Sequence, residues 1–210
     1  MGLLPDFSNT ALFPSFAELP VQDADDNRPV SVATKDDEEE EEEDWWLLAQ
    51  VKHDMTITKP TLVLTDRSGA EFALVFDGYD RGGLDLAGRG LRGGATAAVR
   101  RARRTSPKPL EDGETVQADR KGFVRVGKGR EGEVKVVPGR LERVMELGRK
   151  GGADGEENCA TCGKGGELMK CLGCGRVRYC GKACQVRGWN EGGHKTDCKI
   201  LKAMNQIWDH

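Results

Sequence analysis

All seven cysteines of this 210-residue chain lie between Cys159 and Cys198, together with one of its three histidines. With His194 they form four pairs: Cys159 and Cys162, Cys171 and Cys174, Cys180 and Cys184, and His194 and Cys198. Two residues between ligands in a turn, or three on one helical turn, let both ligand atoms of a pair reach one ion. Four pairs supply eight ligands, which is enough for two tetrahedral sites with none left over.

The chemistry of these ligands favours zinc. Thiolate-rich tetrahedral sites select zinc or iron–sulfur clusters, and the mixed histidine ligand and the lack of a ferredoxin-type cysteine run favour zinc. An odd number of cysteines suits a disulfide framework poorly. We therefore predict two structural zinc ions, with every ligand used and no open position for catalysis. The spacing alone leaves open whether the pairs combine sequentially or in an interleaved way.

The residues between the ligands carry a resemblance to a known family. Tyr179 directly precedes the ligand Cys180, and Gln185 directly follows Cys184. Trp189 lies between Gln185 and His194, and Lys195 directly follows His194. In this order and spacing, residues 159–198 resemble the MYND-type zinc finger, whereas RING and LIM domains space their ligands differently. Residues 190–193 separate Trp189 from His194, where the family usually has two residues, and we expect the extra pair to lengthen a loop without affecting ligation.

The resemblance implies how the ligands are shared between the two ions. MYND fingers interleave their ligand pairs in a cross-brace, so that each ion ties distant parts of the segment together. The implied first site consists of Cys159, Cys162, Cys180 and Cys184. The implied second site consists of Cys171, Cys174, His194 and Cys198.

The N-terminal part of the chain has a different character. Hydrophobic residues make up 37% and charged residues 32% of the sequence, so little apolar surface is available per residue. Residues 1–44 are punctuated by prolines and end in nine consecutive acids, residues 36–44. Such a charge run keeps a segment extended. We predict that 1–44 is a disordered acidic tail, which either serves as a linker or contacts a basic partner or the basic middle of this chain.

Alternation of apolar and polar residues predicts strands after this tail. The predicted strands are 45–58, 61–65, 71–76, 95–102, 122–126 and 133–137. They indicate a small antiparallel β domain, and their order is similar to that of OB-fold barrels. An amphipathic pattern within 138–150 predicts a short helix that closes this domain. His53 falls on the apolar side of the first strand, which favours a place in the core or at its rim.

The predicted fold class is therefore α+β with several domains. A disordered tail (1–44) precedes the β domain (45–147), which a linker (148–158) joins to the zinc finger (159–198). Leu201, Met204 and Trp208 recur at helical spacing and predict a C-terminal helix within 199–210. We find no signal peptide and no membrane-spanning stretch, and expect an intracellular protein of the nucleus or cytoplasm, without a membrane partner.

The sequence suggests two functions and argues against a third. The MYND resemblance implies a protein–protein interaction module, often found in transcriptional regulators, that docks short proline-containing peptides near Gln185 and Trp189. The alternative is nucleic-acid binding by the β domain, because Arg100, Arg101, Arg103 and Arg104 form a basic cluster. Some MYND proteins carry a methyltransferase SET domain, but this chain has neither its motifs nor a phosphate-binding glycine loop. We expect no enzymatic activity.

Overall fold

The computed structural model describes residues 4–22, 44–105, 122–150 and 157–208. The chain divides into two compact units. The β unit comprises residues 9–136, and the finger unit comprises residues 1–8 together with 137–210. The first residues of the chain therefore belong to the same unit as its C-terminal part. Among the described residues, no helix has the length and apolar character needed to cross a lipid bilayer.

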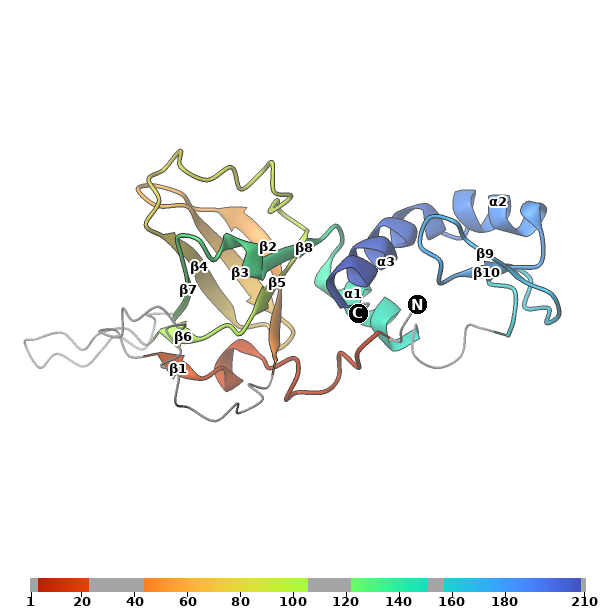
Figure 1. Ribbon diagram of the computed structural model, residues 1–210, viewed down its shortest axis with the longest axis horizontal. Coiled ribbons are helices and arrows are strands. Elements are labelled where there is room, and N and C mark those ends of the chain that lie inside the picture. Colours follow the sequence, from red (N-terminus) through yellow and green to blue (C-terminus); the bar gives the residue numbers. More distant parts are fainter. Residues whose placement is uncertain (1–3, 23–43, 106–121, 151–156, 209–210) are drawn as a thin grey trace, which may run out of the picture. The chain divides into compact units, whose positions relative to one another are not determined.

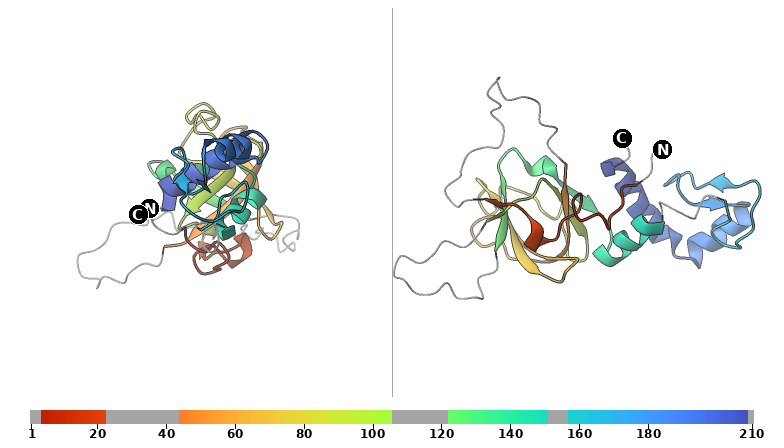
Figure 2. Two further views of the ribbon diagram at one scale, coloured as in Figure 1. Left: turned by 90° about the vertical axis from the view of Figure 1, so that its right-hand side faces the viewer. Right: turned by 90° about the horizontal axis from the view of Figure 1, so that it is seen from below.

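The β unit is built on a curled, eight-stranded sheet that forms a half-barrel (Figures 1 and 2). The strand order across the sheet is β1-β6-β7-β4-β3-β2-β5-β8. The strands are β1 (Val21–Gln22), β2 (Trp46–Asp54), β3 (Thr61–Asp66), β4 (Glu71–Asp77), β5 (Thr96–Arg100), β6 (Arg104–Thr105), β7 (Phe123–Gly127) and β8 (Val134–Val137). Two short 3-10 helices, Phe16–Glu18 and Glu131–Glu133, accompany them.

The sheet is mixed, which corrects the prediction of an antiparallel β domain. Strands β2, β3 and β4 form an antiparallel meander, and β5 returns to pair antiparallel with β2. Strand β7, however, lies parallel to β4, and β1 lies parallel to β6. A parallel pair requires a connection that crosses from one end of the sheet to the other. The chain between β4 and β7, which includes β5 and β6, makes that crossing.

The core of the β unit follows the alternation seen in the sequence. Strands β3 and β4 bury every second residue, and the buried set includes Leu62, Leu64, Phe72 and Leu74, each at most 1% exposed. These side chains point to one face of the curled sheet, because successive residues of a strand face opposite sides. The predicted bounds of β3 and β4 agree with the observed ones to within one residue.

Strand β2 departs from the predicted pattern at a bulge. Leu47, Ala49 and Val51 are buried as the alternation predicts, but Leu48, on the side predicted to face solvent, is buried as well. The pairing with β3 shifts register between Val51 and His53, and an extra residue in one strand changes which side chains face the core. His53 is therefore exposed, and the prediction that it lies in the core or at its rim is wrong. The strand ends at Asp54, before the predicted end at residue 58.

Residues 9–22 pack on the β unit, so the prediction that all of 1–44 is disordered is wrong for this part. Phe16 is 9% exposed and stacks on Phe72, with 4.4 Å between ring centroids. Its backbone N–H donates to a carboxylate oxygen of the buried Asp66 at 2.7 Å. Ser15 and Glu18 form a capping box around the first 3-10 helix. Most of the acidic run lies outside the described residues.

The finger unit contains three helices and a small hairpin among its described residues. The helices are α1 (Leu141–Lys150), α2 (Lys182–Asn190) and α3 (His194–Trp208), and the hairpin pairs β9 (Met169–Lys170) with β10 (Arg178–Tyr179). Helix α3 includes two predicted metal ligands and continues through the predicted C-terminal helix. The predicted linker, 148–158, overlaps the end of α1.

Helix α1 packs against α3 in the finger unit, which corrects the prediction that this helix closes the β domain. Gly139, just before α1, lies so close to Ile200 that an added Cβ would approach the Ile200 Cδ1 to 2.4 Å. Phe7, from the N-terminal segment, occupies the matching position at Gly148 and contacts the Trp208 ring edge-on at 4.9 Å. The apolar face of α1 was predicted correctly, but periodicity does not say which unit a helix covers.

Candidate metal centre

Two clusters of metal-ligating side chains lie in the finger unit. Within each cluster, the ligand atoms all lie within 4.8 Å of one another. The first cluster consists of Cys159, Cys162, Cys180 and Cys184, and the second of Cys171, Cys174, His194 and Cys198. These are the two interleaved sets that the MYND resemblance implied. The sequential alternative, which spacing alone left open, would have combined neighbouring chelating pairs instead.

The distances between ligand atoms fit tetrahedral zinc. With Zn–S bonds of about 2.3 Å, two sulfurs of a tetrahedral site are separated by about 3.8 Å. The Sγ atoms of Cys162 and Cys180 are 3.6 Å apart, and those of Cys180 and Cys184 are 3.5 Å apart. In the second cluster, the Cys171 and Cys198 sulfurs are 3.9 Å apart. The donor sets therefore have the size that a zinc ion requires.

The protonation of two of these ligands, Cys180 and Cys198, is also consistent with a bound cation. The neighbouring sulfurs of Cys184 and Cys162 raise the pKa of the Cys180 thiol to about 12. Burial, together with the negative charge of the Cys174 and Cys171 thiolates, raises the pKa of Cys198 to about 12. Thiolates this close repel one another, and a divalent ion removes that cost when it binds.

His194 is suited to metal binding in its neutral form. It is buried, and burial lowers its pKa, although the charge of Asp197 acts in the opposite direction. A neutral imidazole presents a free lone pair to a metal. Its Nε2 lies 3.7 Å from the Cys174 sulfur. A tetrahedral site with one nitrogen ligand requires a separation of about 3.6 Å.

Tight turns and short helices position the ligands. The turn at Cys159 is closed by its N–H, which donates to the Lys164 carbonyl at 2.9 Å. The Cys171 N–H donates to the Val177 carbonyl at 2.8 Å in the second turn, which the β9–β10 hairpin flanks. Cys184 lies on α2, and Cys198 lies near the start of α3. Each element thus contributes ligands without needing a large apolar core.

Aromatic side chains pack around the histidine ligand. Tyr179 is 2% exposed, and its ring contacts His194 edge-on with 5.8 Å between centroids. Trp189 contacts the same imidazole at 5.8 Å. Helix α2 approaches Tyr179 at Gly188, where an added Cβ would come within 2.7 Å of the Tyr179 ring. The glycine is therefore required for this close approach, a role that the sequence pattern did not reveal.

Polar contacts outside the ligand set hold α3 in place, and no sequence motif indicated them. The side chain of Asn205 donates to the Cys174 carbonyl at 2.8 Å and also contacts Arg176. Arg143, on α1, donates to both carboxylate oxygens of Asp197, at 2.9 and 2.5 Å. Asp197 is 9% exposed and follows the histidine ligand on α3. No spacing rule connects residues this far apart in the chain.

The four residues between Trp189 and His194 form the connection between α2 and α3. Helix α2 ends at Asn190, and the N–H groups of Glu191 and Gly192 both donate to the Arg187 carbonyl. Gly193 adopts φ = 76°, a left-handed conformation that favours glycine. His194 begins α3 within the second cluster. The longer connection is thus accommodated as a loop.

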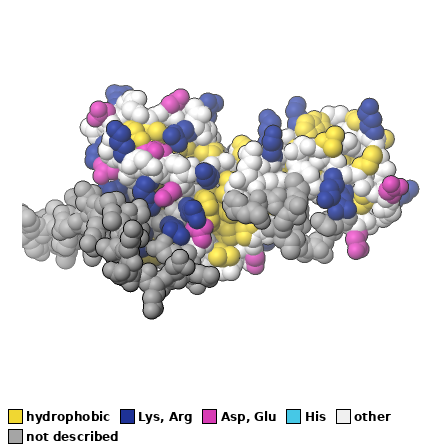
Figure 3. Space-filling model, viewed as in Figure 1, with side chains coloured by type: hydrophobic (Ala, Val, Ile, Leu, Met, Phe, Trp, Pro, Cys, Tyr) yellow, Lys and Arg dark blue, Asp and Glu magenta, His cyan; other side chains and the backbone are white. Residues whose placement is uncertain are grey.

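The two residues expected to face a partner both lie on α2. Gln185 is half-buried, and Trp189 is 37% exposed. They are separated by four positions, so they lie on the same side of the helix. Hydrophobic side chains reach the surface of the finger unit at several places among its basic residues (Figure 3). Among the described residues of this unit, the large exposed hydrophobic ones are Met169, Leu172, Val186 and Trp189.

The hairpin, the short helices and the two four-ligand clusters define a zinc-binding finger of the cross-brace class. Comparison with protein families identifies this finger: residues 159–198 match the MYND finger. The chain therefore carries a MYND-type zinc finger in its C-terminal part. The match spans the ligands from the first cysteine to the last.

Two relatives match over a segment of similar size. The chain is 49% identical over 47 residues to ubiquitin carboxyl-terminal hydrolase 19 of Arabidopsis thaliana, covering 22% of this chain and 7% of the relative. It is 42% identical over 41 residues to SET domain-containing protein 14 of Caenorhabditis elegans, covering 20% of this chain and 9% of the relative. The chain thus spans less than a tenth of the length of either relative.

Proposed function

We propose that this protein is a non-enzymatic adaptor whose MYND finger docks short proline-containing peptides of other proteins. The observation that carries the proposal is the surface of α2, where Trp189 is 37% exposed and lies on the same side as Gln185. An exposed indole stacks on proline rings, and a nearby amide can hydrogen-bond the peptide backbone. Both residues are held by a helix that also carries a cysteine ligand.

The ligand sets support an adaptor role over a catalytic one. Each cluster provides four protein ligands, which is the composition of structural zinc sites, whereas catalytic sites keep a position for water or substrate. The relatives named as a hydrolase and a SET domain protein share only a segment the size of the finger with this chain. We place the adaptor in transcriptional regulation in the nucleus, which is the usual setting implied by the MYND resemblance.

Peptide binding tests the adaptor proposal directly. We expect proline-containing peptides selected against the wild-type protein to bind the Trp189→Ala variant about tenfold more weakly or worse, because aromatic anchors dominate such interfaces. Binding is measured by fluorescence anisotropy. Leu172→Ala is the matched control, because this residue is also a large hydrophobic of the finger unit but is 100% exposed.

A loss of folding must be separated from a loss of docking, because Trp189 also contacts His194. Zinc content is therefore measured for each variant. Gln185→Ala provides a second test. The rings that pack on the histidine ligand are those of Tyr179 and Trp189, so replacing the half-buried Gln185 side chain leaves this packing in place. Equal peptide affinity of wild type, Trp189→Ala and Gln185→Ala would contradict the proposed groove.

Nucleic-acid binding by the β unit is the second candidate, and its strand connections favour it. The meander β2–β4, the pairing of β5 with β2, and the parallel pairing of β7 with β4 support an OB-like barrel. OB-folds commonly bind oligonucleotides. The basic cluster begins at Arg100, at the end of β5, and continues into β6. Such a cluster supplies contacts to phosphates.

A further inference from the structure

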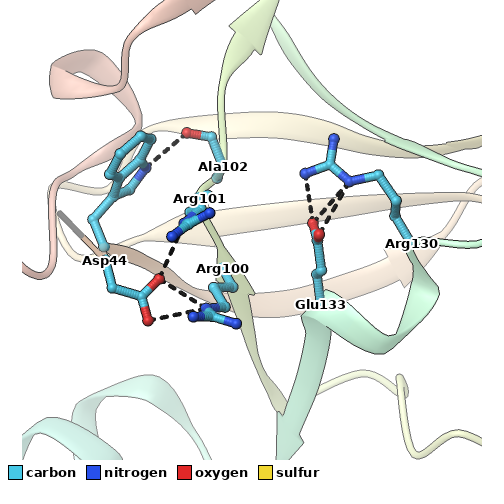
Figure 4. Close-up of polar contacts among 7 residues, drawn as sticks. Asp44, Arg100, Arg101, Ala102, Arg130 and Glu133 are labelled. Atoms are coloured by element: carbon cyan, nitrogen blue, oxygen red, sulfur yellow. Dashed lines mark hydrogen bonds and ion pairs between the residues drawn. The ribbon is translucent and has the colours of Figure 1, made fainter. Parts of the chain in front are cut away.

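Two consecutive arginines of the basic cluster converge on one carboxylate (Figure 4). The Arg100 Nε lies 2.7 and 3.0 Å from the two carboxylate oxygens of Asp44, and the Arg101 Nε lies 3.4 Å from one of them. Consecutive residues of a regular strand point to opposite faces, so this convergence is not a consequence of strand geometry. A local feature of the backbone must bring the two side chains together.

That feature is the backbone at Arg101. Its φ is +48°, the one positive value among the non-glycine residues that the structure describes. This left-handed conformation is uncommon for residues with a side chain, and it ends strand β5 just after Arg100. The Arg101 N–H donates to the Trp45 carbonyl at 2.8 Å, which fixes the turn next to Asp44. A strained backbone position that gathers charged groups often marks a functional site.

The carboxylate is also held in place by its neighbour in the chain. The indole N–H of Trp45 donates to the Ala102 carbonyl at 2.9 Å, on the far side of the two arginines. Trp45, the residue after Asp44, is thus tied to Arg101 and Ala102 by its carbonyl and its indole. The nearby Arg130 pairs with Glu133, at 2.7 Å (Figure 4). Arg130 therefore already has a carboxylate partner of its own.

The site itself matches the chemistry of a phosphate. The Arg100 and Arg101 guanidinium groups both face the Asp44 carboxylate, and the charge of Glu133 also acts on Arg100. The side chains of Arg100 and Arg101 are 46% and 34% exposed, which leaves them accessible to a partner. Guanidinium groups bind phosphate oxygens in the same bidentate way in which they bind carboxylates. Asp44 thus occupies the position that a phosphate group of a ligand would take.

We propose that Arg100 and Arg101 bind the phosphate backbone of single-stranded nucleic acid, and that Asp44 occupies this site in the free protein as an internal competitor. The inference rests on nucleic-acid binding by the β unit, the second function proposed above. It adds a specific binding site and a carboxylate of the same chain that competes with the ligand for this site. Asp44 is also the last of nine consecutive acids in the sequence, so this carboxylate is covalently joined to eight more.

The test compares two substitutions that change the net charge equally. Asp44→Asn removes the competitor, and Asp54→Asn removes an exposed carboxylate at the other end of β2. Binding of a labelled single-stranded oligonucleotide of about 20 nucleotides is measured by anisotropy at several salt concentrations. Thermal unfolding of each variant confirms that the β unit is intact.

We expect Asp44→Asn to bind about three- to fivefold more tightly than Asp54→Asn, the size of effect typical of an exposed ion pair. The slope of log affinity against log salt concentration should steepen by about 0.7 for each additional phosphate that the variant neutralises. In the Arg100→Gln, Arg101→Gln double variant, the affinity should fall, and adding Asp44→Asn should restore nothing. That coupling separates direct competition from a general charge effect.

The outcomes distinguish the inference from the function on which it rests. If the wild type binds but Asp44→Asn and Asp54→Asn are equivalent, nucleic-acid binding stands and the internal competitor is refuted. If neither the wild type nor Asp44→Asn binds the oligonucleotide, both are refuted. A gain that appears only with vesicles containing phosphatidylserine, or only with inorganic phosphate, overturns the assignment to nucleic acid.

Discussion

Replacing Cys174 with alanine is expected to remove one of two zinc ions and to unfold the α3 part of the finger unit, while the β unit remains folded. Cys174 is 1% exposed and belongs to the second cluster with His194 and Cys198. The binding free energy of a structural zinc site, about 10 kcal/mol or more, is also folding free energy. Helix α1 should lose order with α3, because it packs on that helix.

This result can be measured by zinc content and by residue-resolved NMR. The wild type should contain two zinc ions per chain, as the two clusters require. Leu172→Ala is the control, since this residue lies in the same turn between two ligands but is 100% exposed. The control should keep both ions. Loss of the β-unit signals in Cys174→Ala, or retention of two ions, would contradict the assignment of units and ligands.

The second large effect is expected at Phe16, in a segment whose composition had suggested disorder. Phe16→Ala should lower the free energy of unfolding of the β unit by about 3 kcal/mol, as is typical of a buried phenylalanine. The ring is 9% exposed and stacks on Phe72 in the core. Leu12→Ala, in the same segment but 37% exposed, should cost about 0.5 kcal/mol or less.

Hydrogen exchange of the β3 and β4 amides reports this stability separately from that of the finger unit. The comparison with Leu12 separates packing on the core from any general effect of shortening a side chain. Phe16→Leu, which keeps much of the apolar volume, should give an intermediate loss. If Phe16→Ala were no more destabilising than Leu12→Ala, residues 9–22 would have to be regarded as dispensable for the β unit.

The parts of the molecule that could be predicted are those with a short-range signal. Chelating pairs in the sequence identified all eight ligands now found in two clusters. Strict alternation located β3 and β4 to within a residue. The pairing of ligands came from the resemblance to MYND fingers, because spacing alone is compatible with more than one scheme.

The parts that could not be predicted depend on partners far away in the chain. Strands β1 and β6 have two residues each, too few to show any periodicity. Phe7 and Phe16 lie in a segment interrupted by prolines, and their partners are Trp208 and Phe72. The convergence of Arg100 and Arg101 on Asp44 depends on the left-handed backbone conformation of Arg101, which no local sequence pattern predicts.

The contact of Phe7 with Trp208 sets an order of events during synthesis of the protein. Phe7 leaves the ribosome early, but α3, which carries its aromatic partner, is complete only when translation has passed Trp208. The segment 9–136 emerges in between and can complete its own sheet first. Until then, the Phe7 ring, which is fully buried in the finished protein, lacks its contact with the Trp208 ring. The finger unit can therefore complete its packing only after residues from both ends of the described chain have been synthesised.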